Sequence, residues 1–231
     1  MNNQKKKSYI WIVAGILILC VLVWLMSSNF RLEDEDVVSV EGVPISLEVG
    51  ENSLDDGRLK LVNVLEYDGP NFESEGQEFG SYTMFEFQNV SDQFLRNAKI
   101  EMSVNGTDRV LLDIVDVPAG KSVMAIGKGY DTFHSDDLFG IVSCESVFEE
   151  APVIPEGLVV SVENGLLHIT NQSSLDLSGK TIVYKACLLD GQTLFGQNVY
   201  EWKMEDFPIG SMVEIEFTNL MADSIEIVDI K

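Results

Sequence analysis

The chain has 231 residues, of which 38 are acidic and 15 basic, so its formal net charge is −23. A surface this acidic repels polyanions, and we therefore expect neither nucleic acid nor anionic lipid headgroups as partners. Three cysteines are too few for a disulfide-stapled fold, so a hydrophobic core must supply the stability.

An apolar run near the N-terminus predicts a transmembrane anchor. Residues 9–26 contain no charged side chain, and as a helix they would span about 27 Å, close to the hydrocarbon thickness of a bilayer. Trp11 and Trp24 lie near the two ends of this run, where indole rings favour the membrane–water boundary.

The charges around the run predict its orientation. Lys5, Lys6 and Lys7 precede it, and four acidic residues, 33–36, follow it. Because positive flanks stay in the cytoplasm, we expect a cytoplasmic basic tail over residues 1–8. Residues 27–36 would then be an acidic tether, and the rest of the chain would be extracytoplasmic at the cell membrane.

Two other interpretations of this segment remain open. A cleaved signal peptide has a shorter apolar region that ends at small residues, whereas here the run continues through 21–25 and only Ser27 and Ser28 are small. A lipoprotein site would place a small residue directly before Cys20, but that position is Leu19.

Beyond the tether, apolar and polar residues alternate, which predicts strands rather than helices. The alternation is clear in Phe85-Glu86-Phe87-Gln88, and it recurs in residues 167–170, 180–189, 213–217 and 224–230. Turn signals separate the runs: Asp55-Asp56-Gly57, Asn105-Gly106, Asn164-Gly165 and Asp190-Gly191. Short strands with such turns are typical of β-sandwiches and small barrels.

Two segments of the chain repeat one another at an offset of 82 residues. The segment 85–91 aligns with 167–173, and both end in an Asn-x-Ser sequence that begins at Asn89 and Asn171. After an eight-residue insertion, a Pro-x-Gly sequence at Pro118 matches another at Pro208. Asparagine and serine side chains bond to nearby backbone groups, so we expect both motifs to be structural turns.

The repeat predicts the domain organisation. We expect one β-sandwich over residues 37–148, a linker over 149–156 with two prolines, and a second sandwich over 157–231. The predicted fold class is all-β, with an N-terminal transmembrane helix followed by two immunoglobulin-like sandwiches that are related by the internal repeat.

The second domain resembles the FxLYD-type domains of bacterial exported proteins. The matching positions are Leu167, Ile169, Asn171, Ser173, Leu177, Asp190, Gly191, Pro208 and Gly210. The first domain is similar to the telokin-like, immunoglobulin-like domains that often follow a bacterial membrane anchor, through residues 47–64, 82–92 and 117–120. The resemblance implies immunoglobulin-like sandwiches in a cell-envelope setting, and it transfers no catalytic residue.

Few residues point to chemistry. His168 falls between two inward apolar positions and should face solvent, while His134 lies in a polar loop beside acids without the usual zinc or calcium spacing. Cys144 and Cys187 could form a disulfide or remain two buried thiols. We therefore expect no enzyme activity, no cofactor, no metal and no small-molecule substrate.

Aromatic residues form the candidate contact site. Tyr200 and Trp202 alternate onto one face of a strand, and Phe195 lies nearby in the inserted hairpin. Core packing is the alternative role for these three residues. The sequence predicts an extracytoplasmic binding or accessory protein of the cell envelope that acts through protein–protein contacts. The alternative is a structural spacer that positions a partner outside the membrane without a specific ligand.

Overall fold

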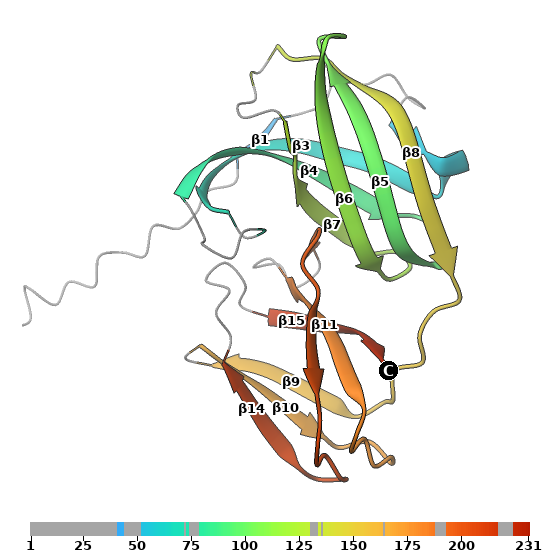
Figure 1. The fold of residues 1–231 in the computed structure, drawn as a ribbon, viewed down its shortest axis with the longest axis vertical. Helices are drawn as coiled ribbons and strands as arrows, with labels where there is room; N and C mark the ends of the chain where they lie inside the picture. Colours follow the sequence, from blue (N-terminus) through green and yellow to red (C-terminus); the bar gives the residue numbers. More distant parts are fainter. Residues whose placement is uncertain are drawn as a thin grey trace, which may run out of the picture. The chain divides into compact units, whose positions relative to one another are not determined.

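A computed structural model describes residues 41–43, 52–71, 73, 79–129, 134, 136–163, 165–187, 193–216 and 224–231. The predicted tail, anchor and tether lie outside these residues. The described part is all-β, with fifteen strands, one 3₁₀ turn (η1, Asp55–Gly57) and no α-helix (Figure 1). The described residues therefore contain no helix that is long and apolar enough to cross a membrane.

The strands divide into two series that we call the N-terminal and C-terminal halves. The N-terminal half contains β1 (Glu41–Val43), β2 (Ser53–Leu54), β3 (Leu59–Pro70), β4 (Phe79–Asn89), β5 (Phe94–Val104), β6 (Asp108–Val117), β7 (Ser122–Ile126) and β8 (Phe139–Glu149). The C-terminal half contains β9 (Leu158–Glu163), β10 (Leu166–Asn171), β11 (Thr181–Cys187), β12 (Thr193–Phe195), β13 (Tyr200–Lys203), β14 (Met212–Glu216) and β15 (Ser224–Ile230).

Three sheets contain these strands. The largest has the order β1-β3-β4-β7-β12-β11-β13, with β2 on β3 and β15 on β11. The other two are β6-β5-β8 in the N-terminal half and β14-β10-β9 in the C-terminal half (Figure 1). The large sheet therefore runs through both halves, which it joins by the parallel pairing of β7 with β12.

The same pairing pattern occurs in both halves. β4 lies between β3 and β7 as β10 lies between β9 and β14, and β5 lies between β6 and β8 as β11 lies between β13 and β15. The registers agree too, because Phe87 pairs with Val123 and Ile169 pairs with Val213. A register shift between residues 101 and 102 of β5 recurs between 183 and 184 of β11, at the offset of the sequence repeat.

The Asn-x-Ser sequence closes the same turn in each half, as predicted. The fully buried Asn89 donates from Nδ2 to the carbonyls of Gln93 (2.8 Å) and Val117 (3.0 Å), and its Oδ1 accepts a bond from the Ser91 hydroxyl (2.7 Å). One side chain thus satisfies buried backbone groups from two connections, including the one that leads into the Pro-x-Gly turn.

Asn171 makes the equivalent bonds in the C-terminal half. It is also fully buried, its Nδ2 donates to the carbonyls of Leu175 (2.9 Å) and Phe207 (3.0 Å), and its Oδ1 accepts from the Ser173 hydroxyl (2.6 Å). Because both amides are enclosed and bonded, Asn89 and Asn171 serve as structural residues of the two turns.

One of the two buried faces of β11 carries the junction between the halves. Val183 packs with Phe94 of β5 and Val228 of β15, and Cys187 joins the core of the N-terminal half. Between them, the fully buried Lys185 donates from Nζ to the carbonyls of Val115 and Gly196, both at 2.7 Å. Burial lowers the pKa of Lys185 to about 7, although the charges of Asp116 and Glu73 act in the opposite direction.

A second polar cluster, centred on Arg96, lies at the same junction. Its guanidinium contacts Asp116 (2.7 Å), Glu149 (3.1 Å) and Asp229 (3.3 Å), and it also lies over the ring of Phe94. Asp229 belongs to β15 and the other acids to β6 and β8, so one cation links both halves. The Arg96 side chain is 27% exposed, which screens these ion pairs only in part.

Candidate partner-binding site

Among the described residues, β13 and β14 are edge strands of two different sheets in the C-terminal half, and together they carry the candidate site. Both are short and alternate apolar with charged residues, so each directs one set of side chains inward. Tyr200 and Trp202 are the inward residues of β13, and Val213 and Ile215 are those of β14. We call these four residues the β13–β14 strip.

The residues of the β13–β14 strip are more exposed than their counterparts in the repeat. All four are half-buried. Their counterparts in the N-terminal half are inward residues of β6 and β7 that are 0–1% exposed: Val110, Leu112, Val123 and Ala125. Apolar side chains at core positions of the C-terminal half therefore stay partly accessible to solvent. Accessible apolar side chains, tyrosine and tryptophan above all, are typical of protein-binding surfaces.

Ring stacking holds the first residue of the strip. Tyr200 stacks on Tyr184 of β11, with ring centroids 5.4 Å apart and planes inclined by 18°. Tyr184 is 5% exposed, and burial, together with the neighbouring Tyr200, raises its pKa. The aromatic surface is thus anchored on a buried ring and does not depend on a flexible loop.

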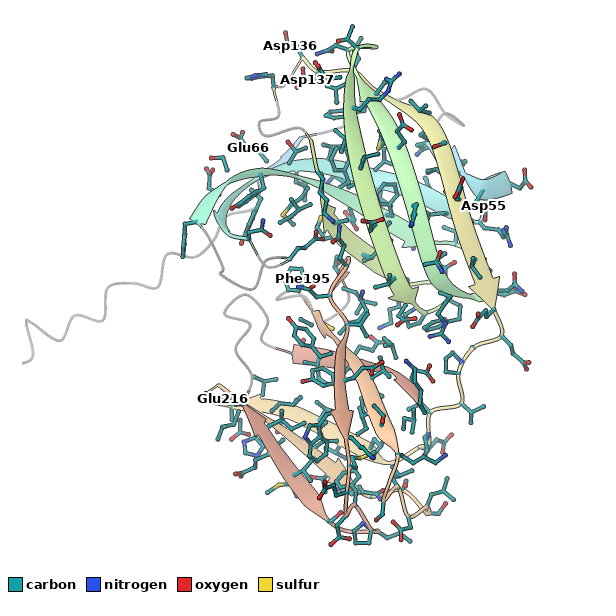
Figure 2. The ribbon with its side chains drawn as sticks, viewed as in Figure 1. Asp55, Glu66, Asp136, Asp137, Phe195 and Glu216 are labelled. Carbon is teal, nitrogen blue, oxygen red and sulfur yellow. The ribbon has the colours of Figure 1, made fainter. Side chains whose placement is uncertain are left out.

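Acidic side chains flank the strip. Glu214 and Glu216 point outward from β14 and are exposed, and Figure 2 shows Glu216 at the end of that strand. The Nδ1 atom of His168 lies 3.4 Å from Glu214, and Glu201 bonds to Lys231 at 2.8 Å. An apolar strip bordered by carboxylates fits a partner segment that is apolar on one face and basic on the other.

The three predicted contact residues do not share one environment. Tyr200 and Trp202 lie on one face of β13, opposite Tyr184 and Ile182 of β11. Phe195 is 1% exposed and pairs with Met124 of β7, so it belongs to the junction (Figure 2). Its position matches the core-packing alternative, whereas Tyr200 and Trp202 keep accessible surface.

The remaining titratable residues have structural surroundings. The backbone N–H of His134 donates to Asp137, whose other carboxylate oxygen accepts from Asn105 at 2.7 Å. Cys144 and Cys187 form no disulfide, and burial raises the pKa of the Cys144 thiol to about 11. Across the described ranges, no group of three or more His, Cys, Asp or Glu residues could hold a metal ion.

A polar pocket of about 410 Å³ opens at another place, beside the turn between β6 and β7. It is lined by Glu86, Gln88, Ala119, Gly120, Lys121, Ser122 and Thr193. The positively charged residue of the pocket, Lys121, already forms an ion pair, because its Nζ atom lies 2.6 Å from Glu226. We therefore place the candidate site at the β13–β14 strip.

Comparison with known proteins finds no relative: no family model, curated protein or solved structure matches the chain.

Two features of this region were not predicted from the sequence. The alternation in residues 213–217 predicts a strand, but it does not tell which of its edges is paired. Lys185 stands in an apolar stretch, Ile182 to Cys187, where a central strand with two buried faces could have been recognised.

Proposed function

We propose that this chain is a membrane-anchored extracytoplasmic binding or accessory protein of the cell envelope, which acts through protein–protein contacts. Two immunoglobulin-like sandwiches, related by duplication, present the contact surface, and the N-terminal run of residues 9–26 tethers them. The recurring strand pairings and the twin asparagine turns support the duplication.

One observation carries the proposal of binding. Tyr200 and Trp202 are the counterparts of Val110 and Leu112, which are fully buried in the N-terminal half. Both aromatic residues are only half-buried in the C-terminal half. Tyrosine and tryptophan supply large contact area at low entropic cost, and they dominate the energetics of protein interfaces. The side chains around Tyr200 and Trp202 are acidic or apolar, and such a surface suits protein recognition better than acid–base or nucleophilic catalysis.

Site-specific photocrosslinking in intact cells tests the proposal. With p-benzoylphenylalanine in place of Trp202, we expect a discrete adduct with one envelope protein, and we expect Tyr200→Ala to weaken it. The matched control carries the same photoreactive group in place of Val147, which is 45% exposed on β8. The same adducts from both positions, or no adduct from position 202, would contradict binding through this surface.

A spacer is the second candidate. The continuous sheet across β7 and β12, together with Lys185 and Arg96 at the junction, is the rigid connection that such a role requires. Protease added to intact cells tests the topology that both candidates share. We expect it to remove an epitope tag at the C-terminus, whereas protection of that tag would contradict an extracytoplasmic location.

A further inference from the structure

The strands β7 and β14 are equivalents whose outer edges face different neighbours. Both pair on one side with the central strand of their half, and both receive an asparagine N–H from β4 or β10: Asn89 to the Lys121 carbonyl (3.0 Å) and Asn171 to the Ser211 carbonyl (2.9 Å). The matching bonds fix which backbone groups point inward and which point to the outer edge.

The outer edge of β7 is covered by a strand from the other half. β12 pairs with it in parallel, with Thr193 opposite Ser122 and Phe195 opposite Met124, and the Gly196 N–H donates to the Met124 carbonyl at 2.6 Å. Leu194 of β12 is fully buried within the core of the N-terminal half. A short extended segment thus completes this sandwich by adding main-chain bonds and filling its core.

The same edge of β14 has no such cover in the part of the chain that the structure describes, where β14 pairs only with β10. By alternation from Ser211, the backbone groups of Met212, Glu214 and Glu216 point to this edge, as those of Ser122 and Met124 do on β7. An edge of this kind, beside a half-buried apolar strip, is a template for another strand.

We propose that the outer edge of β14 accepts an extended segment of a partner protein as an added parallel strand, in the way that β7 accepts β12. This inference rests on the proposed binding function and names its mode. The apolar side chains of the segment cover the β13–β14 strip, and its basic side chains face Glu214 and Glu216.

Two observations favour a basic partner over a second copy of this chain. β12, the segment that completes the N-terminal half, is already paired with β7 and β11, so it is not available to another copy. The chain also carries a net charge of −23, so two copies repel each other, whereas a basic segment is attracted to the exposed carboxylates.

Peptide binding to the full-length chain in detergent micelles tests the inference. The probe is a fluorescent peptide with the residues of β12 and its flanks, 192–198, and two lysines at each end; its anisotropy reports binding. We expect saturable binding that falls at least about tenfold with Glu214→Pro, because proline removes an outward N–H and leaves the pairing with β10 intact. The matched control, Glu214→Gln, keeps the N–H and should lose only about two- to threefold.

Several results would overturn the proposal. Equal losses from Glu214→Pro and Glu214→Gln would show attraction by charge alone, and unchanged binding by Glu214→Pro would exclude the added strand. Should Glu214→Pro lower the melting temperature, Glu216→Pro supplies the same test one outward position further along β14. A change from dimer to monomer in Glu214→Pro would assign the edge to a second copy.

Different experimental results would contradict the strand-addition inference and the proposed binding function. If Glu214→Pro keeps the photocrosslinked adduct at position 202 while the peptide does not discriminate the variants, binding stands and strand addition is wrong. If no adduct forms at all, the binding function itself is wrong.

Discussion

Replacing Lys185 by methionine tests the junction most directly. The Nζ atom of Lys185 is enclosed between the halves, and it donates to the carbonyls of Val115 and Gly196 at 2.7 Å each. Methionine has a similar length but no donor, so Lys185→Met leaves the carbonyls of Val115 and Gly196 without this partner. We expect a loss of about 1–3 kcal/mol in the free energy of unfolding above about pH 10, where Lys185 is neutral in both states, because each neutral hydrogen bond contributes about 0.5–1.5 kcal/mol.

The pH dependence gives a sharper expectation. Burial lowers the pKa of Lys185 to about 7 in the folded chain, while an unfolded lysine titrates near a pKa of about 10.4. Between these values the unfolded state binds more protons, so stability rises with pH, by up to about 1.4 kcal/mol per unit. This contribution is present above about pH 10 and is lost as the pH falls to about 7. Burial also raises the pKa of Glu73 to about 7, so its opposite effect lies below this window.

Urea unfolding of the full-length chain in mild detergent, followed by tryptophan fluorescence, measures both effects. Between about pH 7.5 and about pH 9.5, wild type should gain about 2–3 kcal/mol relative to Lys185→Met. Lys99→Met, the same change at an exposed position of β5, should follow wild type. If the free energy of unfolding depends on pH in the same way for wild type and Lys185→Met, the argument that burial lowers the pKa of Lys185 at the junction is refuted.

Other substitutions probe the turns and the contacts at the junction. Asn171→Ala should cost about 2–4 kcal/mol because it removes the hydrogen bonds of a fully buried amide to two backbone carbonyls and to the Ser173 hydroxyl, while the exposed Asn105→Ala should cost under about 1 kcal/mol; thermal unfolding separates the two. A Cβ on Gly196 would lie 2.8 Å from that of Ala125, so Gly196→Ala should destabilise by about 1–3 kcal/mol. The added substitution Ala125→Gly should restore part of this loss, and a simple sum of the two effects in the double mutant would contradict the clash. Arg96→Met should cost about 1–3 kcal/mol, and high salt should shrink the difference from wild type; a difference that does not respond to salt would contradict the ion-pair account.

Local chemistry explains why much of the fold could be predicted. Alternation marks strands because side chains point to opposite faces, and positive φ is tolerated at Asn105 and required of glycine at Gly106, Gly120 and Gly210, where the chain turns. The asparagine turns were also predictable, since an Asn-x-Ser sequence repeated at a fixed offset indicates the same backbone need twice. These signals need only a few neighbouring residues.

The site was less predictable, because exposure depends on segments that are distant in sequence. Phe195 and Trp202 look alike as aromatic residues of one inserted hairpin, yet β7 covers the first and leaves the second half-buried. Lys185 has the polar character of a surface residue, and only carbonyls contributed by β6 and by the segment after β12 make its burial tolerable.

The sequence by itself determined the all-β class, the turns and the repeat, because period-two hydrophobicity and turn residues act over short distances. Tertiary structure alone decided that β12 completes the N-terminal half, that β11 is buried on both faces, and that the outer edge of β14 has no strand beside it among the described residues. Strand edges are alike in local sequence, and only the long-range pairing of the chain determines which one is covered.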